Sequence, residues 1–220
     1  KLIFIEEGFR MKLFKKVLAA ALAGVLALSV LTGCNNSAAT VTMVDALNDW
    51  SKVYGEGITF EKGNEDLQNQ VNALVKIVDE VGKDIKFGDA KDFYEIYDIV
   101  MNDPAVLKEL GAWAKPFTKA NIGDGSPLYR YGFADISLTL SASNKNKNIY
   151  YANQLVMNSR DINAPDEEWN RGERNWNYGS EAAVAVATGE INGKKYMVAL
   201  FKTTAVTNPD YKPNQNPDKN

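Results

Sequence analysis

Residues 182–202 read AAVAVATGE-INGK-KYMVALFK, in which two apolar runs flank an Asn-Gly pair at positions 192 and 193. An Asn-Gly pair in this setting favours a type I′ hairpin, because both central residues of that turn take positive φ. The turn predicts the following cross-strand pairs: Val184 with Phe201, Val186 with Ala199, Ala185 with Leu200, and Ala187 with Val198. Both faces of the hairpin are apolar, so we expect it in the middle of a sheet that helices cover on at least one side.

Apolar residues recur at helical spacing throughout the first half of the chain. The clearest helix is expected between Asn64, a suitable N-cap, and Gly82, a suitable C-terminal stop. The other expected helices are 41–53, one that begins near Asp89, and one that begins at Asp103-Pro104 and ends at Pro116. The expected buried positions are Val44, Leu47, Trp50, Leu67, Val71, Leu74, Val75, Val78, Phe93, Ile96, Tyr97, Val100, Leu107, Leu110 and Trp113.

After the turn-forming residues of 123–127 the apolar period falls to two, which is typical of strands. The alternating stretch 135–140 predicts a half-buried strand with Ile136, Leu138 and Leu140 inward. The Tyr and Val content of 149–157 favours another strand, whereas 161–181 is polar and predicts mainly a loop. The tyrosines expected on sheet faces are Tyr129, Tyr131, Tyr150 and Tyr151. The whole pattern predicts an α+β fold, with N-terminal helices packed on a C-terminal antiparallel sheet that has a central β-hairpin.

The N-terminal region has the order of a secretory signal: positive charge, an apolar run and then small residues. Met11 is the expected start; the charge comes from Lys12, Lys15 and Lys16, and 17–28 is almost entirely Ala, Leu and Val. The following Leu31-Thr32-Gly33-Cys34 resembles the lipobox of bacterial lipoproteins. This resemblance implies a diacylglyceryl group on Cys34 and a mature protein anchored on the extracytoplasmic face of the cell membrane. An uncleaved anchor is the alternative, although the apolar run is shorter than the roughly 20 residues of a spanning helix.

The sequence divides into four parts on this interpretation. They are an upstream extension and signal peptide at 1–33, the lipidated Cys and a tether at 34–40, a single α+β domain at 41–204, and a disordered Pro- and Asn-rich tail at 205–220. Cys34 is the only cysteine, so no internal disulfide can form. Residues 34–220 carry a net charge of −6, against −3 for the whole chain, because 1–33 contain five basic and two acidic residues. This mildly acidic composition predicts no nucleic-acid partner.

The available chemistry is narrow, because the chain contains no histidine and its one thiol is expected to be lipidated. These features exclude Ser-His-Asp and Cys-His catalysis and histidine-ligated zinc. The sequence has no Gly-rich phosphate-binding motif, and we expect neither a cofactor nor a metal. Asp161, Asn163 and Asp166 are similar to the start of a calcium loop, but Pro165 occupies a ligand position and the turn Gly and closing Glu are missing.

Aromatic and charged residues gather in 161–178, which makes this stretch the candidate binding site. The candidate binding residues are Trp169, Arg171, Arg174, Trp176 and Tyr178. Flat rings can stack on the apolar faces of sugars while charged groups bond the hydroxyls, so the composition indicates glycan binding. Alternatively, the tryptophans fasten a long loop to the core and the charges face water. Paired carboxylates for glycoside hydrolysis could come from Glu167, Glu168, Glu173 and Glu181.

The final hairpin and Met157-Asn158-Ser159 resemble parts of the extracellular cysteine-rich secretory (CAP-type) domains, and this resemblance implies an α-β-α sandwich. The histidines of that family are absent from the chain. The sequence as a whole predicts a lipid-anchored, extracytoplasmic cell-envelope protein that binds an envelope glycan or protein partner without catalysis. The alternatives are a carboxylate-dependent enzyme acting on cell-wall or extracellular glycan, and a structural component of an envelope complex.

Overall fold

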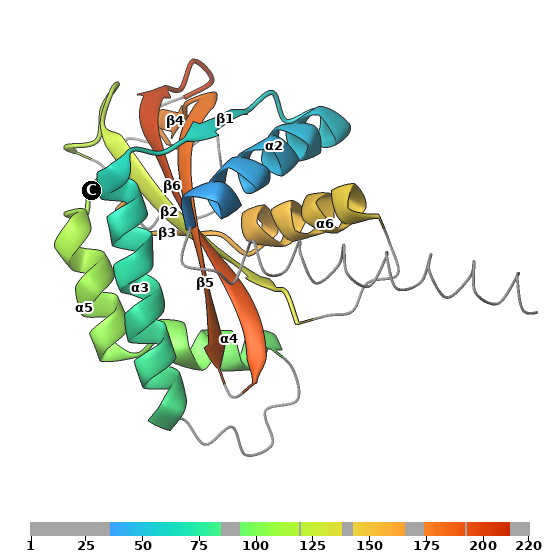
Figure 1. Cartoon of the computed structure of the whole chain (residues 1–220). Coiled ribbons are helices and arrows are strands. Elements are labelled where there is room, and N and C mark those ends of the chain that lie inside the picture. The colour runs from blue at the N-terminus through green and yellow to red at the C-terminus, as the bar shows by residue number, and fades with distance from the viewer. Residues whose placement is uncertain are drawn as a thin grey trace, which may run out of the picture.

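The computed structural model describes residues 36–84, 93–118, 120–137, 143–165, 174–191 and 193–211. Within these ranges it has five helices and a mixed sheet of six strands (Figure 1), which confirms the predicted α+β class. The helices are α2 (Asn36–Tyr54), α3 (Glu65–Asp84), α4 (Phe93–Met101), α5 (Pro104–Trp113) and α6 (Asn144–Met157). The strands are β1 (Thr59–Lys62), β2 (Pro127–Asp135), β3 (Arg160–Asp161), β4 (Trp176–Tyr178), β5 (Glu181–Ile191) and β6 (Lys194–Thr207). The expected signal peptide and Cys34 lie outside the described residues.

β6 lies at the centre of the sheet, whose strand order is β1-β5-β6-β2-β3. β5 and β6 form the predicted hairpin, and all four expected cross-strand pairs are present in its register. Gly193 in the turn has a φ of 81°, as the type I′ geometry requires, whereas Asn192 is outside the described residues. β2 pairs antiparallel with β6, but β1 lies parallel to β5. The sheet is therefore mixed rather than purely antiparallel, because helices and not a hairpin connect β1 to the other strands.

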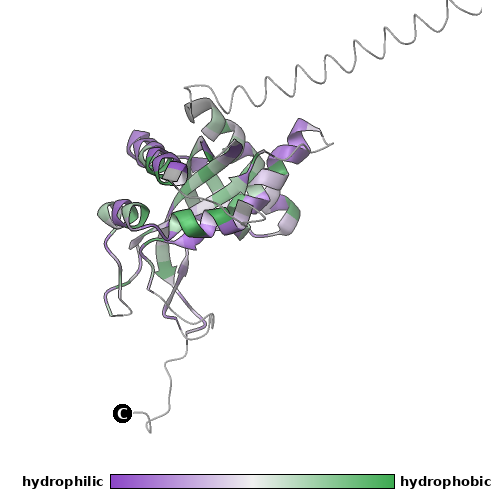
Figure 2. Cartoon of the chain, turned by 90° about the horizontal axis from the view of Figure 1, so that it is seen from below, coloured by the Kyte–Doolittle hydropathy of each residue, from purple (hydrophilic) through white to green (hydrophobic). Residues whose placement is uncertain are grey.

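Helices cover both faces of the sheet, so the domain has three layers (Figure 1). α3, α4 and α5 pack on the face that carries Tyr196, Val198 and Leu200 of β6, and α2 and α6 pack on the face that carries Met197, Ala199 and Phe201. Successive residues of β6 thus enter opposite cores, which explains why the hairpin is apolar on both faces. Figure 2 shows helices of mixed polarity around largely apolar strands.

Side chains of α2 and α3 cover the free edges of β1 and β5. The amide of Asn48 accepts a hydrogen bond from the N–H of Phe60 at 2.9 Å and donates one to its carbonyl at 2.8 Å, as a neighbouring strand would. Beyond the end of β1, Thr40 accepts from the N–H of Val186 at 3.0 Å, and Gln68 donates to the carbonyl of Val186 at 2.9 Å. These contacts satisfy backbone groups that would otherwise be open to pairing with another chain.

The ends of the domain differ from the predicted boundaries. α2 begins at Asn36 rather than near Val41, and Ala39 and Thr40 are both 0% exposed, so the helix includes most of the expected tether. β6 continues to Thr207 and buries Ala205, so the expected tail begins as part of the sheet, and 212–220 lie outside the described residues. Apolar spacing misses these ends because their small and polar residues pack against the domain without producing an apolar period.

The prediction of a strand at 149–157 is wrong, because this segment belongs to α6. Ser143 caps the first turn of this helix, and Tyr151, Ala152 and Leu155 are buried at helical spacing on its inner side. Tyr150, which was expected on a sheet face, is on the same helix and is 38% exposed. The Tyr and Val content of this segment is compatible with either structure, and packing against the sheet decides it.

The strand expected at 135–140 lies earlier in the chain, as β2. Ile136 is buried just beyond its end, while 138–140 are outside the described residues. Tyr129 and Tyr131 are on β2, as predicted. In α5 Leu110 is buried as predicted and Trp113 packs partly buried against the core, but Leu107 is 50% exposed and Val106 is buried in its place. Apolar residues occur on both sides of this short helix, so spacing alone does not select the inner one.

Two predicted helix starts are confirmed by their capping hydrogen bonds. Asn64 accepts from the N–H of Leu67 at 3.0 Å, and Asp103 accepts from the N–H of Ala105 at 2.8 Å. The predicted stop at Gly82 is wrong, because α3 continues to Asp84. A Cβ at position 82 would lie 3.0 Å from side-chain carbons of Ile191. Gly82 therefore allows α3 to approach the hairpin closely, and it does not end the helix.

A buried polar contact joins α3 to the hairpin. The hydroxyl of Tyr196, which is 0% exposed, donates to Oδ1 of Asp79 at 2.7 Å, and the N–H of Glu190 donates to the same oxygen at 3.1 Å. Partial burial raises the pKa of the Asp79 carboxyl above its ordinary value, although both hydrogen bonds act in the opposite direction. Burial and the Asp79 charge raise the pKa of Tyr196, so its hydroxyl stays protonated and donates.

Asp79→Asn is expected to raise the melting temperature at neutral pH, because it removes a partly buried charge and keeps Oδ1 as an acceptor. A carboxyl whose pKa is raised by folding holds its proton more tightly in the native state, so native stability falls as pH rises through that pKa. The advantage of Asp79→Asn should therefore be larger at about pH 7 than at about pH 3, where the parent carboxyl is protonated. Thermal unfolding followed by circular dichroism measures it, and an equal difference at both pH values would contradict the assignment.

Candidate functional site

The candidate stretch 161–178 is only partly described by the structure. Residues outside the description include Trp169, Arg171, Glu167, Glu168 and Glu173, and the predictions made for them remain predictions. Arg174 lies two residues before the start of β4, while Trp176 and Tyr178 are on β4 itself. β4 pairs with the last residues of β6, where Trp176 lies opposite Thr207 and Tyr178 opposite Ala205. The described part of the stretch therefore sits at one end of the sheet.

Trp176 is part of the core and does not present a ring to a ligand. It is 2% exposed and packs in a small cluster with Ile122, Leu128 and Ala205. The backbone nearby is held as well, because Nδ2 of Asn208 donates to the carbonyl of Arg174 at 2.7 Å. Trp176 therefore fastens this segment to the domain, which is the alternative role that the composition of the stretch allowed.

Two arginines lie over the aromatic rings at this end of the sheet. The Arg174 guanidinium carbon is 4.7 Å from the ring centre of Trp176 and 5.6 Å from that of Tyr178. Arg130 of β2 is 4.9 Å from the ring centre of Tyr178. Arg130 is 48 positions before Tyr178 in the chain, so the sequence did not indicate that the two lie together. They meet because β2 and β4 both pair with β6, where Arg130 lies opposite Phe201. Stacking of this kind orients a guanidinium while leaving its N–H edge free to bond.

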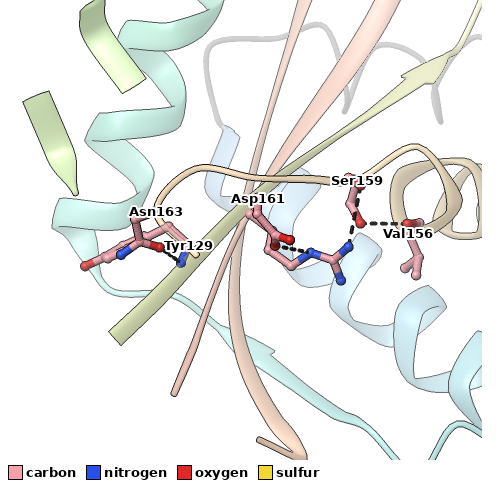
Figure 3. Close-up of polar contacts among 6 residues, drawn as sticks. Tyr129, Val156, Ser159, Asp161 and Asn163 are labelled. Atoms are coloured by element: carbon pink, nitrogen blue, oxygen red, sulfur yellow. Dashed lines mark hydrogen bonds and ion pairs between the residues drawn. The ribbon is translucent and has the colours of Figure 1, made fainter. Parts of the chain in front are cut away.

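Arg130 also contacts the 159–163 segment, of which Ser159, Asp161 and Asn163 are labelled in Figure 3. Nε of Arg130 forms an ion pair with Oδ1 of Asp161 at 3.0 Å, and Nη2 donates to the carbonyl of Ser159 at 3.5 Å. The hydroxyl of Ser159 donates to the carbonyl of Val156 at 2.7 Å, which ties this segment to the end of α6. The side chains of Arg130 and Asp161 are 32% and 38% exposed, so the pair is at the surface and orients the guanidinium more than it stabilises the fold.

Asn163 has a structural role that argues against a calcium loop at this position. It is 2% exposed; its Oδ1 accepts from the N–H of Tyr129 at 2.9 Å, and its Nδ2 donates to the carbonyl of Pro127 at 2.9 Å. Asp161 is paired with Arg130, and Asp166 is outside the described residues. Among the residues that the structure describes, there is no group of three or more metal-ligating side chains.

Tyr178 is a hydrogen-bond donor rather than a base. Burial raises the pKa of its hydroxyl, and the nearby Asp161 carboxylate raises it further, while the two arginines oppose the shift. The hydroxyl therefore stays protonated throughout the physiological range. Its one proton is donated to Asp161, so the donors that the cluster offers are those of the guanidinium groups, which suit binding of an oxygen-rich or anionic group.

An apolar cavity of about 60 Å³ opens beside this cluster, on the face of the sheet that α2 and α6 cover. Its apolar walls are Ile58, Phe60, Val156, Ala182 and Phe201, and its polar lining comes from Arg130, Ser159, Tyr178, Gly179 and Thr203. A mainly apolar concavity with a few polar groups at its rim is the usual form of a ligand site. The cavity and the arginine–tyrosine cluster together form the candidate binding site.

A second, wider hollow lies at the C-terminal half of α2 and is open and polar. It is lined by two carboxylates, Asp45 and Asp49, together with Asn48, Lys52 and neighbouring residues. Asp49 pairs with Lys145 of α6 at 2.9 Å, and this hydrogen bond holds the pKa of the Asp49 carboxyl below its usual value. A general acid for glycoside hydrolysis needs a raised pKa, so Asp49 does not suit that role.

No family model, curated protein or solved structure matches this chain. The site must therefore be interpreted from its own geometry. In the part of the chain that the structure covers, none of the helices is both long enough and apolar enough to cross a membrane.

Proposed function

We propose that this protein is a lipid-anchored, extracytoplasmic component of a bacterial cell envelope that binds a ligand or partner and catalyses no reaction. The observation that carries the proposal is the Leu31-Thr32-Gly33-Cys34 motif behind a basic and apolar segment. A chain with one cysteine and no histidine has few means of catalysis beyond carboxylates, lysines and tyrosines. A binding role requires none of these groups to change its protonation.

The position of α2 supports a short connection between anchor and domain. Cys34 is five residues from Ala39, the first position shown to be buried, and the helix begins at Asn36. Five residues span at most about 18 Å even when fully extended. A lipid group on Cys34 would therefore hold the domain against the membrane surface and not on a long tether.

The binding face in this proposal is the arginine–tyrosine cluster with its cavity. Arg130 and Arg174 both stack on Tyr178, and Arg130 lines the apolar cavity beside them. An envelope glycan or a protein partner would meet the same guanidinium groups. The carboxylate-enzyme alternative depends mainly on Glu167, Glu168 and Glu173, which lie outside the described residues, and the described lining of the cavity contains no carboxylate. The exposed large apolar side chains are spread over α2, α4, α5, α6 and β6, which does not by itself favour an assembly role.

Cys34→Ala is expected to abolish acyl labelling and to move the protein out of the detergent phase, because the thiol is the site of lipid attachment in this proposal. The measurement is incorporation of an alkyne-tagged fatty acid together with the intact mass of the purified protein. Ser37→Ala is the matched control, since it alters a neighbouring small polar residue and leaves the motif intact. An unmodified thiol on an intact polypeptide would refute the anchor.

A further inference from the structure

The cavity beside Arg130 is small enough to define the size of what it can hold. About 60 Å³ corresponds to roughly four to six water-sized positions. Its lining includes Phe60 and Phe201, which form an edge-to-face pair with ring centres 6.1 Å apart, and Val156 of α6. An apolar group of about four to six heavy atoms fits this space, and water gains little there because the walls offer few polar partners.

Arg130 provides the one charged group on the lining, among the residues that the structure describes. Its contacts use Nε, toward Asp161, and one N–H of Nη2, toward the carbonyl of Ser159. No contact within the described residues uses Nη1, so two N–H donors remain for an acceptor at the cavity mouth. Tyr178 also lines the cavity, but its protonated hydroxyl donates to the Asp161 carboxylate and leaves Arg130 as the donor for a ligand.

We propose that the cavity binds the apolar chain of a small carboxylate whose head group is held by the two N–H donors of Nη1 of Arg130. This inference rests on the proposed function, since it names the ligand class of the proposed binding face. A carboxylate accepts charge-assisted hydrogen bonds from a guanidinium more strongly than a neutral amide does. Asp161 already pairs with Nε of Arg130, so the site has no large net positive charge. It therefore distinguishes a carboxylate from other groups by the placement of the unused Nη1 donors.

Two sources share this chemistry: a free short-chain branched acid, and a peptide whose last residue is Leu with a free α-carboxylate. In both 4-methylpentanoate and a C-terminal Leu, the branch carbon is three bonds from the carboxylate carbon. The cavity need hold only the branched aliphatic group in either case, because its volume is about 60 Å³.

Isothermal titration of the full chain, purified in detergent, tests the proposal. The probes are 4-methylpentanoate, its neutral amide, acetate, and an acetylated Gly-Gly-Leu peptide with a free or an amidated C-terminus. We expect 4-methylpentanoate to bind about tenfold more tightly than its amide and acetate to bind too weakly to measure. Tighter binding of the free peptide than of the acid would assign the site to peptide C-termini, and the reverse would assign it to free acids.

Four variants separate the cavity from the charge. Val156→Phe fills the cavity and should abolish binding, whereas Met157→Phe adds the same bulk at a 71% exposed neighbour on the same helix and should not. Arg130→Met should make acid and amide bind equally, whereas Arg160→Met removes a charge that pairs with Asp98 away from the cavity and should leave the preference unchanged. Circular dichroism establishes that each variant is folded.

The proposal is overturned by any of three results. These are no binding of the acid or the free peptide to the parent chain, equal binding of acid and amide to the parent chain, or unchanged binding by folded Val156→Phe. The first two need no variant, so a variant that fails to fold leaves the test intact. Acyl labelling at Cys34 is measured separately, so failure of the anchor and failure of the cavity are distinguishable.

Discussion

Replacing Gly132 by alanine is expected to destabilise the domain by about 3 kcal/mol or more, at the upper end of overpacking costs. A Cβ at this position would lie 1.9 Å from the carbonyl oxygen of Leu155 and 2.8 Å from its carbonyl carbon. These are backbone atoms of α6, so no side-chain rotation relieves the clash and the helix must move away from β2. At roughly 2–4 °C per kcal/mol for a domain of this size, the melting temperature should fall by about 6–12 °C.

Gly111→Ala is the matched control for this experiment. Gly111 is inside α5, and a Cβ there meets no atom within 4 Å. Alanine is favoured over glycine in a helix interior by about 0.8–1 kcal/mol, so Gly111→Ala should raise the melting temperature slightly. Scanning calorimetry of both variants measures the contrast. Similar melting temperatures for the two would show that α6 does not pack on β2 as closely as the structure indicates.

Trp176→Ala is expected to cost about 3–5 kcal/mol, the range for removing a large buried aromatic side chain. Trp176 is 2% exposed and fills the cluster formed with Ile122, Leu128 and Ala205, which joins β4 to β2 and β6. Its loss leaves a cavity and removes the surface over which Arg174 stacks. The midpoint of urea unfolding measures the loss. Weakened ligand binding by this variant therefore reports a damaged fold and not a lost contact.

Trp176→Phe separates packing from the polar atom of the indole. The Nε1 of Trp176 is buried, and no described residue accepts a hydrogen bond from it. Phenylalanine keeps most of the aromatic contact and removes this donor, so its cost should stay below about 1.5 kcal/mol. A loss as large as that of the alanine variant would mean that the indole N–H has an essential partner. A loss below about 1 kcal/mol for Trp176→Ala itself would mean that β4 is not fastened by this side chain.

The hairpin was predictable to the level of individual pairs because its information is local. Asn-Gly fixes the turn, the turn fixes the register, and the alternation of the strands then fixes the faces. The helix caps at Asn64 and Asp103 were predictable for the same reason, since each acts within one turn. The segment 149–157 was not predictable, because Tyr and Val suit both strand and helix and only contact with the sheet selects α6.

The candidate site was predictable only in part, because some of its residues come from segments far from the 161–178 stretch in the sequence. Arg174 and Tyr178 are in the stretch that composition singled out, and they do lie together. Composition also selected Trp176, whose burial removes it from the surface. Arg130 and Phe60 were not selected, because nothing near them in the sequence is unusual. They reach the site through the pairing of β2 with β6 and of β1 with β5.

The sequence by itself determined the hairpin, its register and its two apolar faces, since turn chemistry and side-chain alternation act over a few residues. It also limited the chemistry, because a chain without histidine cannot gain one by folding. Only the tertiary structure decided that helices cover both faces, that Trp176 is core, and that Arg130 borders a cavity. Those outcomes depend on which surfaces exclude water from one another across the whole chain, and burial of that kind is a property of the assembled layers and not of any segment.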